Sequence, residues 1–407
     1  MGEILFLAHR APWPPNRGDK IRSHHFLQKL MDCAPVHIAC FADDEAEKEV
    51  GWNRKAELAS CEIVVRKKPK WRAGIEALVT GKPVSLLSFA SSEISSYVAQ
   101  LIANRPIDCI FIFSGQMAQF IPADYRGRVV MDFADVDSAK FESYADEGSG
   151  PMAWVNRREG RLLRSFEKTV AERADHSLFV SQAEAELFRQ RSGLSGDRVK
   201  AVGNGIDLAF YGAQDVDPAV TGNSGPLILF TGQMDYQPNV QAVESFSTKV
   251  MPDILACLPD ARFAIVGRAP SEKVRQLDRQ NGTIVTGAVD DIRSWILAAD
   301  VVVAPLRIAR GIQNKVLEAM AMARPVVASA CAAEGIEATN GKHFLIAKSV
   351  DDEARLVCDL LADPEQAGRL GEQARILIHS HYSWEKQLAD LPRLCGLYVA
   401  VADPVPA

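Results

Sequence analysis

Lys315 and Glu318 stand three residues apart, a spacing that puts an ammonium group and a carboxylate on one face of a helix. Before them come a buried-type strand, residues 301–304, and a loop with Arg307 and Arg310. The N–H groups of a helix's first turn lack intrahelical partners and bind anions. The cation could therefore hold phosphate, while the carboxylate could accept hydrogen bonds from hydroxyls. A nucleotide-sugar carries both groups.

Polar residues and glycines also follow the neighbouring predicted strands. They are Gly232, Gln233 and Asn239 after strand 227–230, Gly267 and Arg268 after strand 263–266, and Gly287 after strand 284–286. Glycine lets a backbone or phosphate approach closely, and arginine offers a fork of donors for a diphosphate. A tight turn alone explains any single glycine. Several such strand ends in one domain favour a shared ligand crevice.

The first half of the chain has weaker candidates. Gly18 precedes a predicted helix and Lys20 follows it closely, which suits a phosphate or sugar oxygen, although an exposed basic loop explains them equally well. Asp132 ends a predicted strand, and Asp135 and Asp137 follow it. Capping or turn roles explain these aspartates better than a metal does. We therefore expect no metal and favour an acceptor-side role.

Two basic stretches remain in this half. Residues 66–72 mix cations with Trp71, a combination that suits an anionic lipid surface. Arg157, Arg161 and Arg164 share one helical face, for which a solvated surface is the usual explanation.

Short apolar runs alternate with helical patterns along the whole chain. The predicted strands are residues 4–8, 36–41, 62–65, 109–113, 129–132, 177–180, 199–202, 227–230, 263–266, 284–286, 301–304, 326–329 and 344–347. Near-continuous apolar strands separated by helices predict α/β domains with parallel sheets covered on both faces. A break poor in apolar residues spans residues 213–226. We expect two Rossmann-like, doubly wound domains that face each other across a cleft.

Composition excludes several classes of protein. A net charge of −6 argues against a nucleic-acid binder, and 407 residues favour two domains. The eight cysteines are scattered without metal-ligand spacing, as expected for a reduced, cytoplasmic protein. The N-terminal apolar run is too short for a signal peptide, and no stretch is long enough to span a membrane.

The whole chain resembles the retaining glycosyltransferases of the GT-B fold, family 4. Within that family it looks like those associated with PEP-CTERM/exosortase exopolysaccharide loci. The resemblance rests on the Gly18 loop, Val180-Ser181, residues 203–207 (GNGID), Thr231-Gly232, residues 266–268 (VGR), Gly287, residues 317–321 (LEAMA), residues 324–329 (RPVVAS) and the tail 381–384 (HYSW).

The resemblance implies roles for residues of the second half. Glu318 matches the glutamate that binds the donor's ribose hydroxyls, and Arg268 most resembles the family's diphosphate cation. Arg310 stands where the family has a second glutamate; guanidinium is a donor only, so it suits phosphate or a sugar carboxylate. Lys315 adds positive charge near the diphosphate. Gly311, Ile312 and Gln313, at the helix start, complete the expected donor contacts.

The expected activity is transfer of a sugar, with retention, from a nucleotide diphosphate donor of UDP or GDP type. The acceptor would be lipid-linked or a polysaccharide, at the inner membrane face, and no cofactor is required. The expected domains are residues 1–210 on the acceptor side, 211–380 on the donor side, and a C-terminal helix in 381–407 that packs back on the first domain. A nucleotide-sugar epimerase and a non-catalytic nucleotide-sugar-binding protein remain as alternatives.

Overall fold

The computed structural model describes residues 2–212, 216–220, 225–309 and 312–397. The chain forms two compact units. The first comprises the residues up to Gly203 together with those from Leu388 onward, and the second comprises Asn204–Gln387.

The first unit is built on a seven-stranded parallel sheet in the order β3-β2-β1-β4-β5-β6-β7. Its strands are β1 (Glu3–Ala8), β2 (Val36–Ala42), β3 (Ser60–Val65), β4 (Ile107–Phe113), β5 (Arg128–Ala134), β6 (His176–Phe179) and β7 (Val199–Ala201). The central strands β1 and β2 are buried along their whole length. This is why they read as unbroken apolar runs rather than as an alternating pattern.

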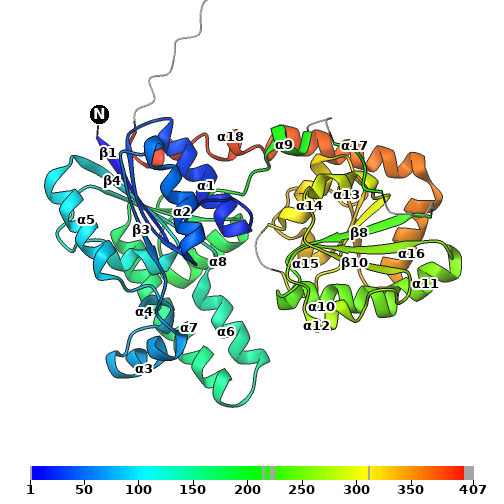
Figure 1. Cartoon of the computed structure of the whole chain (residues 1–407), viewed down its shortest axis with the longest axis horizontal. Coiled ribbons are helices and arrows are strands. Elements are labelled where there is room, and N and C mark those ends of the chain that lie inside the picture. Colours follow the sequence, from blue (N-terminus) through cyan, green and yellow to red (C-terminus); the bar gives the residue numbers. More distant parts are fainter. Residues whose placement is uncertain (1, 213–215, 221–224, 310–311, 398–407) are drawn as a thin grey trace, which may run out of the picture. The chain divides into compact units, whose positions relative to one another are not determined.

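Helices of the first unit connect the strands. They are α1 (Gly18–Met31), α2 (Glu45–Asn53), η1 (Lys55–Glu57), α3 (Lys70–Thr80), α4 (Val84–Leu87), α5 (Ser92–Asn104), η2 (Gly115–Phe120), α6 (Asp137–Glu147), α7 (Gly150–Arg173) and α8 (Gln182–Ser192). Figure 1 shows α3 and the adjoining part of α7 at the margin of this unit, away from its sheet.

The second unit is built on a six-stranded parallel sheet in the order β10-β9-β8-β11-β12-β13. Its strands are β8 (Leu227–Thr231), β9 (Arg262–Val266), β10 (Thr283–Gly287), β11 (Val301–Ala304), β12 (Val326–Ser329) and β13 (Leu345–Ala347). All thirteen predicted strands are confirmed, with ends that move by a few residues at most.

Helices cover both faces of the second sheet (Figure 1). They are α9 (Leu208–Gly212), α10 (Gln237–Ser245), η3 (Phe246–Val250), α11 (Met251–Cys257), α12 (Glu272–Arg275), α13 (Ile292–Ala298), α14 (Asn314–Ala321), α15 (Ala330–Ala333), α16 (Val350–Ala362), α17 (Pro364–His381) and α18 (Trp384–Gln387). One extensive core links the sheet to these helices and includes Phe230, Phe246, Phe263 and Leu317.

The C-terminal segment returns to the first unit at Leu388. The chain enters α18 and then α19 (Leu391–Leu394), each four residues long. Pro392 lies in the first turn of α19, and Gly396 follows its C-cap with a left-handed φ of 74°. Arg128 on β5 anchors the segment by donating to the carbonyl of Leu394 at 3.1 Å.

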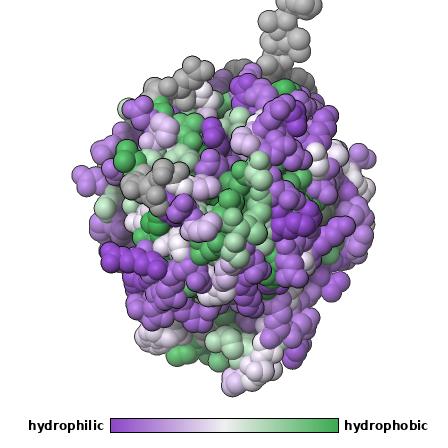
Figure 2. Space-filling model, turned by 90° about the vertical axis from the view of Figure 1, so that its right-hand side faces the viewer, coloured by the Kyte–Doolittle hydropathy of each residue, from purple (hydrophilic) through white to green (hydrophobic). Residues whose placement is uncertain are grey.

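The surface is mainly hydrophilic on the face shown in Figure 2, where a narrow strip of hydrophobic residues runs among hydrophilic ones. This pattern is typical of helices that pack one face on a core and leave the other in water. None of the described helices is both long and apolar enough to cross a bilayer.

Candidate functional site

The carboxyl ends of β8 and β11 lie side by side at the point where the strand order of the second sheet reverses. The chain runs from β8 outward to β9 and β10, then crosses back to β11 on the other side of β8. Ligands of doubly wound sheets bind at such a switch point. Gly232 and Gln233 follow β8, and α14 with Lys315 and Glu318 follows β11. Topology therefore unites residues that lie about eighty positions apart.

Lys315 is held across this edge by Asn239. Its Nζ donates to Asn239 Oδ1 at 2.7 Å and lies 4.1 Å from the centroid of the Phe230 ring. The amide of Asn239 is fixed in turn, since its Nδ2 donates to the carbonyl of Gln233 at 2.9 Å. Burial lowers the pKa of Lys315 to about 7, against the opposing charge of Glu318, which raises it.

The position of Lys315 is unfavourable for helix stability. It occupies the first turn of α14, which contains no acidic residue, and Gln313 before it gives no side-chain cap. A cation at the positive end of the helix dipole, beside uncapped N–H groups, is destabilising in itself. An anionic ligand would compensate both features.

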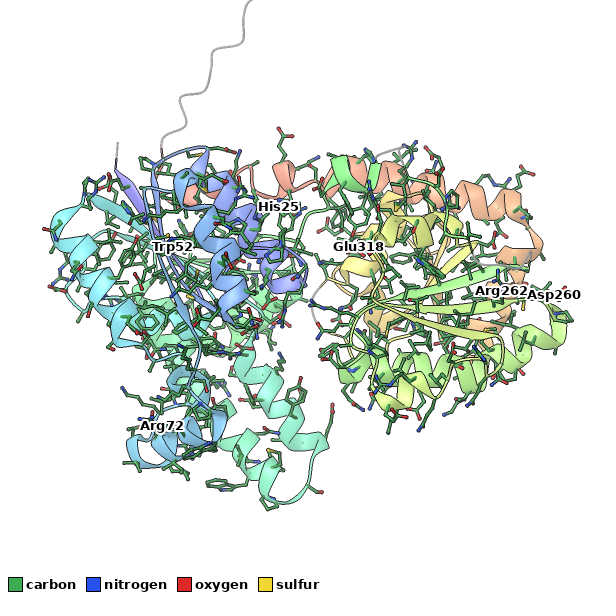
Figure 3. The ribbon with its side chains drawn as sticks, viewed as in Figure 1. His25, Trp52, Arg72, Asp260, Arg262 and Glu318 are labelled. Atoms are coloured by element: carbon green, nitrogen blue, oxygen red, sulfur yellow. The ribbon has the colours of Figure 1, made fainter. Side chains whose placement is uncertain are left out.

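Glu318 lies one turn further along α14 and is partly exposed (Figure 3). Burial raises its pKa, while a hydrogen bond from the Tyr211 hydroxyl and the charge of Lys315 lower it. Burial and the charge of Glu318 together raise the pKa of Tyr211 far above its usual value, so Tyr211 is a donor at any physiological pH. This bond fixes the carboxylate and leaves it further capacity to accept hydrogen bonds.

Gly232 and Gly267 bring two strand ends into direct contact. A Cβ on Gly267, whose φ is 153°, would lie 1.7 Å from the carbonyl oxygen of Gly232. A Cβ on Gly232 would lie 3.2 Å from Lys315 Nζ. Arg268 then reaches back and donates to Gln233 Oε1 at 3.3 Å. The glycines are therefore required by close packing at this edge, and they bring Arg268, Gln233 and Lys315 into one neighbourhood.

The remaining residues predicted for this site have less defined surroundings. Gly287 has a left-handed φ of 73°, and its carbonyl accepts from the N–H of Gly267 at 3.0 Å. Ile312 and Gln313 are partly exposed just before α14. Arg310 and Gly311 lie outside the described residues.

In the first unit, two of the residues predicted to bind a ligand, Lys20 and Asp132, are buried and paired with other side chains. Lys20 is only 4% exposed and forms an ion pair with Glu47, so its charge is already matched within the fold. Asp132 is fully buried and accepts from Arg22 Nε and Nη2 at 2.8 and 3.0 Å. Both residues are engaged in the interior of the unit rather than presented to a ligand. Gly18 begins α1 in open space.

Asp135 is the predicted residue of the first unit that retains an unsatisfied polar atom. Its Oδ1 is buried and has no hydrogen-bond partner. Burial, with the nearby carboxylates of Glu184 and Asp137, raises its pKa to about 6. Among the described residues, no group of three or more His, Cys, Asp or Glu side chains could hold a metal ion.

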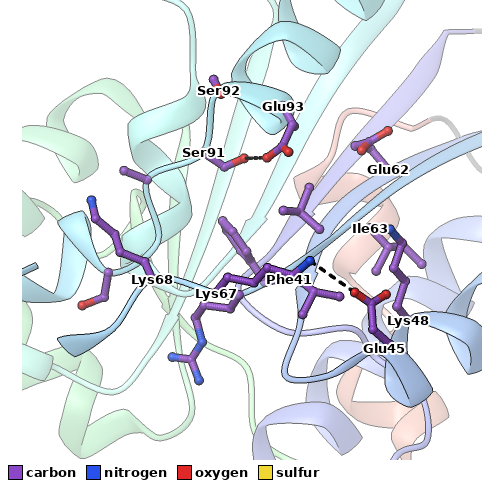
Figure 4. Close-up of a pocket in the computed structure, with 15 residues that line it drawn as sticks. Phe41, Glu45, Lys48, Glu62, Ile63, Lys67, Lys68, Ser91, Ser92 and Glu93 are labelled. Carbon is purple, nitrogen blue, oxygen red and sulfur yellow. Dashed lines mark hydrogen bonds and ion pairs between the residues drawn. The ribbon is translucent and has the colours of Figure 1, made fainter. Parts of the chain in front are cut away.

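A pocket of about 360 Å³ opens in the first unit beside β2, β3 and the start of α5 (Figure 4). Glu45 and Lys67 on its wall pair at 3.4 Å, and Ser91 donates to Glu93 at 3.0 Å. The charged groups of Glu45, Lys67 and Glu93 thus have partners within the unit. The pocket contains none of the residues that the sequence singled out for donor or acceptor binding.

Two contacts were missed from the sequence. Tyr211 is 107 residues from Glu318, and Arg22 is 110 residues from Asp132, so no local spacing could have paired them. The available signal was position alone, since Tyr211 follows the GNGID segment and Arg22 follows Lys20 in a polar helix start.

Family comparisons identify each half of the chain separately. Residues 22–205 match the family described as "Glycosyl transferase 4-like domain", and residues 225–363 match the one described as "Glycosyl transferases group 1". Both halves of the chain therefore match glycosyltransferase families. Each match falls almost entirely within one of the two doubly wound units.

Solved structures show the same fold. The chain is similar to Anabaena Alr3699/HepE, solved in complex with UDP and glucose, with a TM-score of 0.69 and 14% identity over 97% of this chain and 99% of that one. Together with the two parallel sheets, this likeness confirms the predicted GT-B fold class.

Two curated relatives have similar sequences over part of their length. The phosphatidyl-myo-inositol mannosyltransferase of Propionibacterium freudenreichii is 30% identical over 159 residues, which is 39% of each chain. The enzyme of the same name from Mycobacterium leprae is 26% identical over 273 residues, 61% of this chain and 70% of that one. The chain thus spans well under half of the first relative.

Proposed function

We propose that this chain is a glycosyltransferase that transfers a sugar from a nucleotide diphosphate donor, with retention at the anomeric carbon, and that the donor binds at the carboxyl edge of the second sheet. The contact that supports this most directly is the one between Lys315 and Asn239, which holds a cation against the uncapped start of α14. That arrangement suits a diphosphate.

Each residue has a distinct part in this proposal. Glu318, oriented by Tyr211, accepts hydrogen bonds from the ribose hydroxyls. Lys315 and Arg268 face the diphosphate, and from the sequence we expect the same role of Arg310. Gly232 and Gly267 allow the two strand ends to pack closely, which positions Gln233 and Arg268 at the site.

During transfer, the bond between the anomeric carbon and the diphosphate oxygen breaks and leaves its electrons on phosphate. The acceptor hydroxyl oxygen forms the new bond on the same face of the sugar, and its proton passes to the departing phosphate oxygen. The positioned cations stabilise the negative charge that develops on that phosphate, which is commonly the largest catalytic effect. In this scheme the chain's cations neutralise the leaving group, so we propose turnover without a divalent metal.

For the acceptor we propose a lipid-linked or growing glycan in exopolysaccharide synthesis, at the inner membrane face, as the resemblance to exosortase-associated enzymes implies. The names of the two mannosyltransferase relatives, which refer to a phosphoinositide lipid, support a lipid acceptor. The Anabaena protein, whose structure was solved with UDP and glucose, supports a nucleotide-sugar donor.

A thermal-shift screen of UDP, GDP, ADP and TDP, each with and without sugar, should identify the donor, because a ligand of the folded state raises Tm. We expect one base to raise Tm and its sugar form to release nucleoside diphosphate in the presence of EDTA when an acceptor is added. NMR of the product should show that the transferred sugar has the same anomeric configuration as in the donor.

The alternatives give different outcomes in the same experiment. A donor that binds without turnover with any acceptor would favour a non-catalytic binding protein, and conversion of the sugar without an acceptor would favour an epimerase. If no nucleotide shifts Tm, the donor assignment fails.

A further inference from the structure

Helix α3 of the first unit turns its large apolar side chains outward. Ala73 and Ala77, one turn apart, are buried, while Trp71, Ile75 and Leu78 are 69%, 57% and 65% exposed. The spacing of these three places them on one stripe of the helix, opposite the alanines. A helix that packs only small residues inward and leaves its bulky ones in water has an unoccupied binding face.

The first turns of α7 extend this surface. Met152 and Trp154 are 66% and 57% exposed. One turn beyond Trp154, Arg158 donates to the carbonyl of Ala77 on α3 at 2.7 Å, so the two helices are joined. Glu159 also fixes the start of α4, accepting from the backbone N–H groups of Val84 and Ser85 at 2.8 Å. The apolar side chains of α3 and α7 thus belong to one rigid part of the first unit.

Basic side chains border this apolar surface. Arg72 (Figure 3), Lys82, Arg157 and Arg161 are exposed, and Arg161 is two turns from Trp154 on the same face of α7. Lys67, which precedes α3, is 79% exposed and pairs with Glu45 at 3.4 Å.

The acidic groups close to these cations are fewer. The carboxylate of Glu76 on α3 is engaged by Lys68 and Arg72, and Asp146 and Glu147 are exposed at the end of α6. The border of the apolar surface is therefore mainly positive.

We propose that the outward face of α3 and the first two turns of α7, here called the α3–α7 surface, docks the protein on an anionic lipid bilayer. Tryptophan and aliphatic side chains enter the interface between headgroups and acyl chains, and the surrounding lysines and arginines attract anionic headgroups. Arg72 of the first basic stretch and Arg157 and Arg161 of the second, which the sequence left separate, border this one surface. This inference rests on the proposed function only in that docking would bring the protein to the membrane that holds a lipid acceptor. Lipid binding by the α3–α7 surface itself requires neither donor nor acceptor.

Vesicle sedimentation of the full chain tests this surface. Wild type should sediment with vesicles of phosphatidylcholine and phosphatidylglycerol, and much less with phosphatidylcholine alone. Trp71→Ser/Leu78→Ser should weaken that binding at least about tenfold, because two interfacial anchors are lost. Arg157→Gln/Arg161→Gln should remove most of the preference for anionic vesicles, as should high salt.

The control is Val220→Ser/Ile376→Ser, which removes exposed aliphatic side chains from the second unit and should bind like wild type. Equal vesicle binding by wild type and Trp71→Ser/Leu78→Ser overturns the proposal, and so does wild type that stays in the supernatant. A wild-type dimer that becomes monomeric in Trp71→Ser/Leu78→Ser would show that a second copy covers the surface instead. Because donor and acceptor are absent, failure here leaves the proposed glycosyl transfer untouched.

Discussion

Lys315→Met should lower kcat by about 10²–10³-fold, the usual effect of removing one group that stabilises charge in a transition state. The substitution removes the ammonium that Asn239 holds beside the start of α14. Methionine keeps the length and apolar stem of the side chain, so the surrounding packing is retained. Initial rates of nucleoside diphosphate release, measured at saturating donor, give the effect directly.

Although Lys315→Met should lower activity, it should not lower the stability of the protein. The folded-state pKa of Lys315 is about 7, below that of a free lysine, so between pH 7 and roughly pH 10 the unfolded chain binds more protons. The contribution of Lys315 to stability therefore rises with pH across this window, and the buried charge carries its full cost below pH 7. At neutral pH the Tm of Lys315→Met should equal or exceed that of wild type.

The same pKa predicts proton uptake on donor binding. A diphosphate favours the charged lysine, so wild type at pH 8 should take up a fraction of a proton, and Lys315→Met should not. Calorimetric titration in buffers of different ionisation enthalpy measures this number. The matched control is Lys249→Met, at an exposed position of the second unit, and it should leave kcat and proton uptake unchanged. If Lys315→Met kept the wild-type kcat, Lys315 would have no part in the proposed donor site.

Arg22→Met should destabilise the protein by about 3–5 kcal/mol, because it leaves the carboxylate of Asp132 buried without its partner. Arg22 and Asp132 are 2% and 0% exposed, and Arg22 also donates to the carbonyl of Gly203 at 3.3 Å. Urea unfolding followed by circular dichroism should show a lower midpoint with an unchanged slope.

A second substitution separates loss of the pair from loss of packing. Arg22→Met/Asp132→Asn removes the uncompensated charge and should regain a large part of the lost stability. Lys168→Met breaks an exposed pair with Glu172 in the same unit and should change the unfolding free energy by less than about 1 kcal/mol. If Arg22→Met were no worse than Lys168→Met, Asp132 would be free to serve a ligand after all.

Much of the fold was predictable because the strands of parallel sheets are buried on both faces. Strands such as β1 and β11 are continuous apolar runs, and the segments between them show the helical periodicity of apolar residues. The form of the C-terminal return was not predictable in this way. The short helix α19 depends on Pro392 and Gly396 and on the bond from Arg128 to Leu394 within the first unit.

The site was predictable only where residues follow strand ends. Lys315 and Glu318 share a helix, so their common face follows from spacing, and Gly232 and Gly267 follow strands that pair. The bond from Tyr211 to Glu318 and the burial of Asp132 by Arg22 depend on tertiary structure. From the sequence, Lys20 and Asp132 were predicted to face a ligand. Their burial could not be recognised there, because it depends on partners that only the tertiary structure reveals, Glu47 and Arg22.

The donor site is tested most directly by calorimetric titration of the nucleoside diphosphate that the screen selects. Glu318→Ala should weaken its Kd at least about tenfold, since hydrogen bonds between a carboxylate and the ribose hydroxyls are lost. Glu244→Ala, at an exposed position of α10, should bind like wild type. Equal Kd values for wild type and Glu318→Ala, with both proteins folded, would contradict the assignment of the donor to the carboxyl edge of the second sheet.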